Sequence, residues 1–480
     1  CELMDVVISV DTSVAHLSGA LGRPTWVLLP YVPDWRWLLD REDSPWYDSV
    51  KLYRQEVDRS WASVLKRLSV ALLSQTKQTA NLVLAMQTID QSEEALISYE
   101  KATALDSNDH EIHLNKGIIL RRQKHFDEAL KSFAKAIELK SDCAEAYFNR
   151  GFVFKQQHHY EAALSSYDKA ISIKPDYVDA LINKGNTLQA LKQFEAAVVS
   201  YNQAISFEPN YAEAHSNLAN ALAELKQFEA ALASYDKAIS LKPDYSEAYF
   251  NRGYAQTELK QFEAALASYD KVISLKPDYS EAYSNRGCAQ AELKQFEAAL
   301  TSYDKAISIK PDYAEAYFNR GVALHALKQL DAALASYDKA ISIKPDYVDA
   351  LINKGNALQA LKQFEAAIAS YDLAISIQPD YAEAHCNLAN ALTQLKQFEA
   401  ALASYDKAIS LKPDYSEAYS NRGYAQAELK QFEAALASYD KAISLKPDYA
   451  GAHWNKSLEL LALGQFKEGW KSYEWRWKHE

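Results

Sequence analysis

The stretch AEAYFNRGVALHALKQLDAALASYDKAISIKPDY (residues 314–347) contains two segments in which apolar residues recur at the three- and four-residue spacing of an α-helix. The recurring residues are Tyr317, Gly321, Leu324, Ala333, Tyr337, Ala340 and Ile341. Each segment therefore has one apolar face. The small residues Gly321 and Ala333 let two helix backbones approach closely, and Pro345 ends the second segment. The stretch predicts a pair of packed helices.

The same pattern returns every 34 residues along most of the chain. Its prolines are Pro175, Pro209, Pro243, Pro277, Pro311, Pro345, Pro379, Pro413 and Pro447. A fixed period of this size is typical of stacked repeats, because one helix pair cannot bury its apolar face without neighbours. Twelve units are expected, beginning near residues 76, 110, 144, 178, 212, 246, 280, 314, 348, 382, 416 and 450. The first is degenerate and the last carries Arg476 where most others have alanine, so these two are interpreted as the ends.

Positions within a unit are numbered 1 to 34 from the first residue of its first helix. Asp346 precedes the unit that begins at residue 348, and Asp349 follows three residues later, so we expect Asp346 to cap that helix in a capping box. The segments AEAYFNRG, VDALINKGN and AEAHSNLAN occur at 144, 178 and 212 and return almost unchanged at 314, 348 and 382. This recurrence indicates that a block of five units was duplicated.

Positions 2, 6, 9 and 13 form one stripe on the first helix, opposite its packing face. Position 6 is asparagine in all eleven well-formed units: Asn115, Asn149, Asn183, Asn217, Asn251, Asn285, Asn319, Asn353, Asn387, Asn421 and Asn455. Asparagine within a helix costs about 0.7 kcal/mol relative to alanine, so a compensating interaction is expected. In one interpretation the amides form a ladder that satisfies the backbone of an extended peptide. In the other, duplication spread a residue that only bonds within its own helix pair.

Aromatic residues at positions 4 and 24, Gly or Ala at 8, Ala at 20 and 27 and Pro at 32 resemble the tetratricopeptide repeat over residues 76–480. This resemblance implies an all-α fold, a right-handed superhelix (α-solenoid) of antiparallel helix pairs with a concave groove that binds proteins or extended peptides. Units such as AEAHSNLANALAELKQFEAALASYDKAISLKPDY are similar to those of the O-linked N-acetylglucosamine transferase family, in which the position-6 asparagines contact the substrate polypeptide. Arg252, Arg286 and Arg320 at position 7 depart from the leucine of that family, so we expect different groove electrostatics.

Residues 1–74 differ in composition, and five of the nine tryptophans lie before residue 62. Residues 5–10 (DVVISV) predict a strand, VAHLSGALG a helix, PTWVLLP a second strand and SWASVLKRLSVALL a closing helix. The turn Asp11-Thr12-Ser13 precedes the predicted helix. Hydroxyl groups at a helix N-terminus can hold phosphate, although most Asp-Thr-Ser turns only cap the helix. The signal from these residues alone is therefore weak.

The longer string, residues 3–70, resembles the last part of the donor-binding domain of GT-B, heptosyltransferase-like glycosyltransferases. The resemblance places Asp11, Thr12, Ser13 and His16 at the phosphates of a nucleotide sugar. It implies a C-terminal fragment without acceptor domain or catalytic base, so no catalytic residue is assigned. EGWKSYEWRWKHE (residues 468–480) is similar to the segment that leads from such repeats into a transferase domain.

Charge and cysteine usage exclude several classes of partner. Lys plus Arg is 52 and Asp plus Glu is 64, and the net charge of -12 disfavours nucleic acid and anionic membranes. The four cysteines form no CxxC pair and have no metal-ligand spacing, so we expect a reducing, cytoplasmic location and neither metal nor cofactor. No apolar run approaches the ~20 residues of a membrane-spanning helix. A nucleotide sugar is expected as a ligand only if a complete transferase domain is present.

The sequence therefore predicts a peptide-binding repeat scaffold (residues 76–480) preceded by a small α/β remnant (residues 1–74). The alternative is the substrate-recognition part of a protein glycosyltransferase whose catalytic domain lies mostly outside this chain. A spacer without a ligand is the third possibility.

Overall fold

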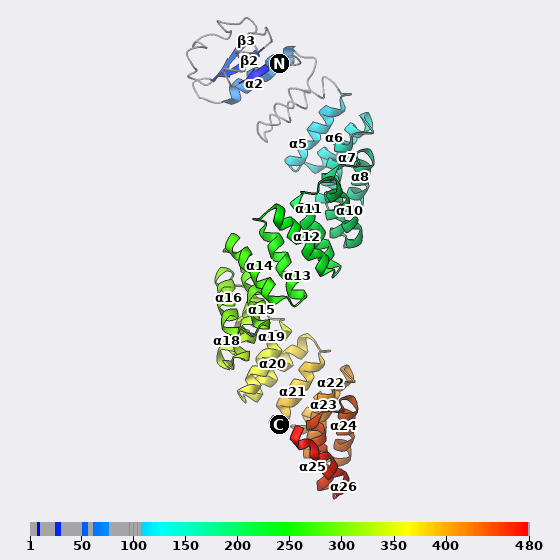
Figure 1. Ribbon diagram of the computed structural model, residues 1–480, viewed down its shortest axis with the longest axis vertical. Coiled ribbons are helices and arrows are strands. Elements are labelled where there is room, and N and C mark those ends of the chain that lie inside the picture. Colours follow the sequence, from blue (N-terminus) through cyan, green and yellow to red (C-terminus); the bar gives the residue numbers. More distant parts are fainter. Residues whose placement is uncertain are drawn as a thin grey trace. The chain divides into compact units, whose positions relative to one another are not determined.

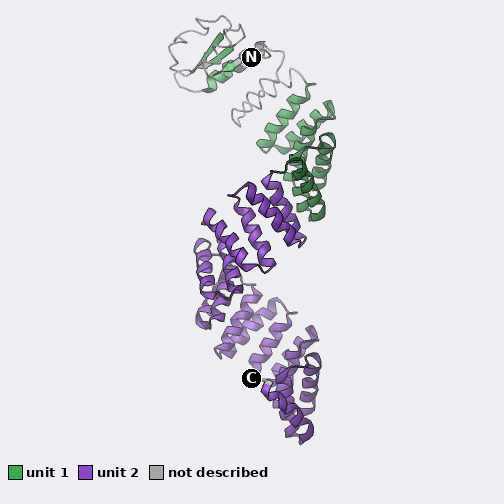
Figure 2. Ribbon diagram, in the orientation of Figure 1, with its two compact units in different colours: residues 1–209 green, residues 210–480 purple. Residues whose placement is uncertain are grey.

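The two helices predicted for residues 314–347 are present in the computed structural model as α17 (Ala314–Ala326) and α18 (Leu330–Ile343). The structure describes residues 7–9, 25–29, 50–55, 61–75, 96, 99, 103 and 107–478. The chain divides into two compact units, residues 1–209 and 210–480 (Figure 2). The division falls between two repeats, and the expected domain boundary at residues 74–76 stays a prediction.

Three short parallel strands and one helix form the described α/β part. They are β1 (Val7–Ser9), β2 (Thr25–Leu29), β3 (Val50–Arg54) and α2 (Trp61–Gln75), with strand order β1-β2-β3. Thr25 lies opposite Val7 on one side and opposite Val50 on the other. The two predicted strands and the closing helix are confirmed, whereas β3 was not foreseen from the sequence.

Helix pairs follow one another from residue 110 onward (Figure 1). In residues 1–209 they are α5 (His110–Arg122), α6 (Phe126–Leu139), α7 (Ala144–Gln156), α8 (Tyr160–Ile173), α9 (Val178–Ala190) and α10 (Phe194–Phe207). In residues 210–480 they begin with α11 (Ala212–Glu224), α12 (Phe228–Leu241), α13 (Ser246–Glu258), α14 (Phe262–Leu275), α15 (Ser280–Glu292) and α16 (Phe296–Ile309). After α17 and α18 come α19 (Val348–Ala360), α20 (Phe364–Ile377), α21 (Ala382–Gln394), α22 (Phe398–Leu411), α23 (Ser416–Glu428), α24 (Phe432–Leu445), α25 (Ala450–Ala462) and α26 (Phe466–Tyr473). The expected all-α repeat fold is confirmed for the units that begin at residues 110 to 450.

Each first helix ends in a turn whose position-15 residue has a left-handed backbone. Lys328 has φ 58°, and its N–H donates to the carbonyl of His325, while the next N–H, that of Gln329, donates to Leu324. These two bonds form a Schellman motif, which satisfies carbonyl groups at the end of the helix. The last unit has Gly464 at this position, with φ 74°.

The predicted capping box is wrong. The residue before α19 is Tyr347, which makes no side-chain cap bond, and Asp346 instead accepts the N–H of Val348 through its backbone carbonyl at 3.0 Å. Tyr347 takes this place because its ring packs on Phe318 of the preceding first helix, with ring centroids 5.0 Å apart. The start of α19 is therefore set by packing on the previous unit, whereas α5 is capped by the side chain of Asp109, which accepts the N–H of Glu111.

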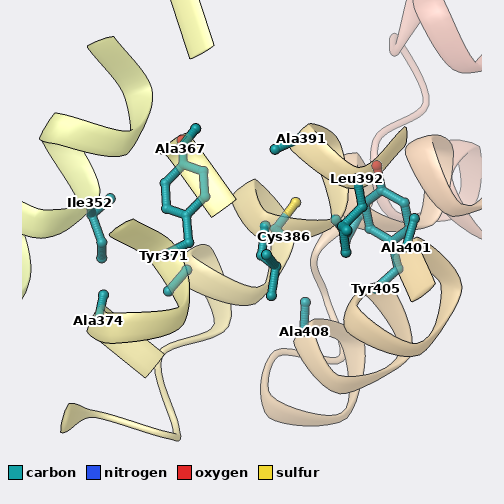
Figure 3. Close-up of a cluster of buried hydrophobic side chains, with 14 of the residues drawn as sticks. Ile352, Ala367, Tyr371, Ala374, Cys386, Ala391, Leu392, Ala401, Tyr405 and Ala408 are labelled. Atoms are coloured by element: carbon teal, nitrogen blue, oxygen red, sulfur yellow. The ribbon is translucent and has the colours of Figure 1, made fainter. Parts of the chain in front are cut away.

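Tyrosines at position 24 are inserted among small residues to form the core. A Cβ atom on Gly321 would lie 2.5 Å from the ring of Tyr337, so this close approach requires glycine or a shifted ring. Figure 3 shows Tyr371 and Tyr405 surrounded by alanines of the same cluster, which include Ala367, Ala374, Ala401 and Ala408. The core therefore runs through the stack as a series of similar contacts between neighbouring units.

The last second helix is shorter than the others, and whether this unit is an end of the array stays a prediction. Helix α26 stops at Tyr473, and Glu474–Lys478 form a short 3-10 helix, so the position-27 residue lies outside any second α-helix. In residues 210–480 each first helix also contacts the next first helix directly, whereas successive second helices make no comparable contact. The first helices therefore lie on the more crowded side of the stack in this part of the chain.

Candidate functional site

We call positions 2, 6, 9 and 13 of the first helices the first-helix face. Asn149 is buried with 4% of its surface exposed, and the other ten position-6 asparagines are half-buried. On the same stripe, most residues at position 2, such as Glu247, are exposed. The face thus presents carboxylates together with partly accessible amides.

Some of the asparagines bond to their own helix. The Nδ2 atoms of Asn149, Asn183 and Asn353 donate to the carbonyl oxygens of the residues four positions earlier, at 2.8, 2.9 and 2.9 Å. Bonds of this kind hold the amide against the helix and partly compensate for the low helix propensity of asparagine.

Other asparagines bond to the preceding repeat. Asn251, Asn387 and Asn421 donate from Nδ2 to the Oδ1 atoms of Asn220, Asn356 and Asn390, which occupy position 9 of the unit before, at 3.0, 3.1 and 2.9 Å. Asn319 likewise donates to the sulfur of Cys288 at 3.4 Å. These amides therefore link neighbouring first helices.

The position-9 oxygen also accepts a bond from the core. The hydroxyl groups of Tyr235, Tyr371 and Tyr405 donate to Asn220, Asn356 and Asn390, each at 2.7 Å. A chain of bonds thus runs from a buried tyrosine, through position 9, to the position-6 amide of the next unit. The position-9 residues were missed as partners in the sequence, although the pairing of Asn at 9 with Asn at 6 one unit later is visible there.

An asparagine carries two N–H donors and a carbonyl acceptor, so a single hydrogen bond does not use the whole amide. Asn285 interacts with the side chain of Tyr269. Asn115 and Asn217 have interaction partners as well. Asn455 is half-buried on α25. The structure thus gives the asparagines a role in packing. Some of them bond within their own helix, as the second interpretation expected, whereas others bond to the preceding repeat, which it did not expect. Their contact with a peptide stays a prediction.

The position-7 cations connect repeats. Nη1 of Arg252 lies 2.7 Å from Oδ1 of Asp236 in the preceding unit, and its Nε donates to Ser268 of its own unit at 3.1 Å. The same pairing joins Arg286 to Asp270, Arg320 to Asp304, Arg422 to Asp406, Lys184 to Asp168 and Lys354 to Asp338. These cations are neutralised by aspartate at position 25, so they add no net positive charge to the first-helix face.

The predicted nucleotide-sugar residues Asp11, Thr12, Ser13 and His16 lie outside the described residues, and their role stays a prediction. Within the part of the chain that the structure describes, no cluster of His, Cys, Asp or Glu could hold a metal ion. No helix in that part is both long and apolar enough to cross a membrane.

Repeated two-helix hairpins, stacked through small residues and a buried tyrosine, define a helical repeat protein. Sequence profiles agree with this class. The profile described as TPR repeat matches residues 117–158, 185–226, 219–260, 289–328, 355–396 and 389–430. The profile described as tetratricopeptide repeat matches residues 144–177, 246–279, 314–347 and 416–449. Together they match well over half of the chain, which belongs to the tetratricopeptide repeat family.

Several solved structures are similar. YrrB, described as a TPR protein with an unusual peptide-binding site, is 28% identical over 42% of this chain and 99% of its own, with a TM-score of 0.37. MamA is 24% identical over 36% of this chain and 94% of its own, with a TM-score of 0.34. A tetratricopeptide repeat protein from Parabacteroides merdae is 19% identical over 52% of this chain and 98% of its own, with a TM-score of 0.42. No curated protein matches the chain.

Proposed function

We propose that this repeat scaffold binds an extended polypeptide along the first-helix face. The observation that carries the proposal is the amide at position 6, which occurs once per unit on eleven successive first helices and is half-buried in ten of them. The bonds to position 9 or to the helix backbone restrain several of these amides before any ligand arrives. Restrained amides lose less conformational entropy on binding, which favours association with a peptide backbone.

The proposal is tested by replacing Asn285, Asn319, Asn353 and Asn387 together with alanine. The probe is a fluorescein-labelled mixture of random-sequence peptides of about 15 residues, which spans roughly 50 Å when extended. Backbone recognition predicts that affinity for the mixture falls at least about tenfold, because each net hydrogen bond is worth about 1 kcal/mol.

A control variant separates binding from stability. Changing Asp270, Asp304 and Asp338 to asparagine removes the ion pairs to position 7 and keeps every residue at positions 2, 6, 9 and 13. This control should lower the melting temperature and retain the affinity. If the alanine variant instead loses stability and binds as the parent does, the asparagines serve packing alone and the proposal fails.

A second candidate function rests on the α/β part. We propose that β1, β2, β3 and α2 are the C-terminal fragment of a GT-B, heptosyltransferase-like donor domain, and that the repeats act as the substrate-recognition part of a protein glycosyltransferase similar to O-linked N-acetylglucosamine transferases. Three adjacent parallel strands support this candidate, because donor-binding domains of this type are built on parallel sheets. We expect this chain alone to turn over no nucleotide sugar. Turnover above blank that is lost on changing Asp11 and His16 would contradict this.

A cytoplasmic location belongs to the same proposal. The described cysteines, Cys143, Cys288 and Cys386, are free thiols, as expected in a reducing compartment. Labelling of these thiols in the native protein from its source cells, compared with the reduced protein, tests this expectation.

A further inference from the structure

The first-helix face of residues 212–478 carries a one-sided charge. Position 2 is acidic in seven of its eight units, from Glu213 to Glu417, and position 13 adds four glutamates, among them Glu258 and Glu428. Positions 2, 6, 9 and 13 of these units contain no lysine or arginine. Glu281 lies 3.8 Å from Lys310, which belongs to the turn after the second helix. Since the position-7 cations are paired between repeats, the face itself is negative.

Two exposed tyrosines lie within this negative face. Tyr254 and Tyr424 occupy position 9 of the units that begin at residues 246 and 416, and each has 43% of its surface exposed. Glu258 and Glu428 follow these tyrosines by four residues on the same helices, about one helical turn further along, and both glutamates are exposed. Each ring therefore has a carboxylate as its neighbour on the helix surface, and the same arrangement occurs twice, five units apart.

An aromatic ring next to a carboxylate is suited to a cationic side chain. The negative face of the ring attracts an ammonium or guanidinium group, and the carboxylate supplies a charge-assisted hydrogen bond. Neighbouring carboxylates reinforce the negative potential. Burial, Glu258 and Glu224 raise the pKa of the Tyr254 hydroxyl, and burial together with Glu428 raises the pKa of Glu459. A bound cation would relieve this repulsion between carboxylates.

We propose that the first-helix face of residues 212–478 binds an extended peptide that carries lysine or arginine, with one cationic side chain at Tyr254–Glu258 and another at Tyr424–Glu428. This inference rests on the proposed function and adds the class of peptide. The asparagines contact the peptide backbone, whereas the two tyrosine–glutamate pairs select the side chains. The negative charge of the whole chain also favours encounter with a cationic partner.

The test uses three fluorescein-labelled peptides of equal length, about 15 residues, that differ only in the third residue of a Gly-Ser-Xaa repeat. Xaa is lysine, glutamine or glutamate. Fluorescence anisotropy should show the lysine peptide binding at least about tenfold more tightly than the glutamine peptide, the glutamate peptide more weakly than either, and the lysine affinity falling as salt rises.

Variants locate the effect. The double variant Glu258→Gln and Glu428→Gln should weaken the lysine peptide roughly threefold to tenfold and leave the glutamine peptide unchanged. Tyr254→Leu and Tyr424→Leu together should act in the same direction. The matched control is Glu263→Gln with Glu433→Gln, which removes the same charge from exposed positions on the second helices of the same units and should change neither affinity.

The outcomes are distinguishable. If none of the three peptides binds, the proposed function itself fails. If all three bind equally and all are lost in the asparagine variant, the proposed function stands and the selection of cationic peptides is overturned. If the control double variant weakens the lysine peptide as much as Glu258→Gln with Glu428→Gln does, the preference reflects net charge alone and the two subsites are refuted.

Discussion

Replacing Tyr337 with phenylalanine should leave the local stability unchanged or raise it, whereas the same replacement at Tyr405 should lower it. Both tyrosines occupy position 24, and they are 0% and 1% exposed. The hydroxyl of Tyr405 donates to Asn390 at 2.7 Å and lies 3.3 Å from the hydroxyl of Thr393. The hydroxyl of Tyr337 is buried without a partner, because position 9 of its unit is Val322.

The magnitudes follow from this difference. A net hydrogen bond is worth about 1 kcal/mol, so Tyr405→Phe should destabilise its unit by about that amount. A buried hydroxyl without a partner costs about 1 to 3 kcal/mol, and Tyr337→Phe removes that cost. The two variants should therefore differ by about 2 to 4 kcal/mol. Because long repeat arrays do not unfold in two states, we would measure amide hydrogen exchange in α17, α18, α21 and α22 instead of a global transition.

Tyr371→Phe provides the matched control, since the hydroxyl of Tyr371 donates to Asn356 in the same way as that of Tyr405. It should behave like Tyr405→Phe. Equal destabilisation by the replacements at positions 337, 371 and 405 would refute the reasoning, because the partner at position 9 would then have no energetic effect.

Three further predictions follow from the packing, the turns and the buried tyrosines. Ala299 lies at a fully buried helix contact, so Ala299→Leu should lower the free energy of opening of α15 and α16, measured by amide exchange, by about 1 to 3 kcal/mol. Unchanged exchange would mean that this packing face is misassigned. Lys328→Gly should raise the free energy of local opening at the left-handed turn by up to about 1 kcal/mol and so slow amide exchange there, whereas Lys328→Val should accelerate exchange. The reverse order would exclude backbone strain at this residue. Burial raises the pKa of Tyr269 to about 12, so the stability from its neutral form is present below pH 10 and falls by about 1.4 kcal/mol per pH unit between pH 10 and 12. Ultraviolet titration of the parent and of the Tyr269→Phe variant checks this, and a difference curve in which Tyr269 ionises near pH 10 would contradict that burial effect.

Local patterns predicted the helices well. The apolar periodicity of residues 314–347 was sufficient to locate α17 and α18. The capping prediction failed at Asp346, because propensity rules describe an isolated helix, and the ring of Tyr347 is held by Phe318 of the preceding unit. The strand β3 was missed because its short segment pairs with residues far away in the sequence.

The candidate site was predicted in position and incompletely in chemistry. Asn251 and Asn387 lie on the expected stripe, but their partners, Asn220 and Asn356, are on other repeats. Arg286 was expected to alter a groove and instead pairs with Asp270 of the preceding unit. In both cases the partner lies in the preceding unit, 31 residues before Asn251 and 16 residues before Arg286, and a single-unit pattern does not describe such a contact.

The sequence by itself determined the repeat period, the helix-pair unit and the face on which the asparagines lie, because these depend on the spacing of apolar and small residues within one hairpin. Only the tertiary structure decided which donors and acceptors meet, since the offset between successive hairpins depends on the close contact of glycine and alanine with tyrosine rings. That contact brings position 6 beside position 9 of the unit before it, and position 7 beside the preceding aspartate.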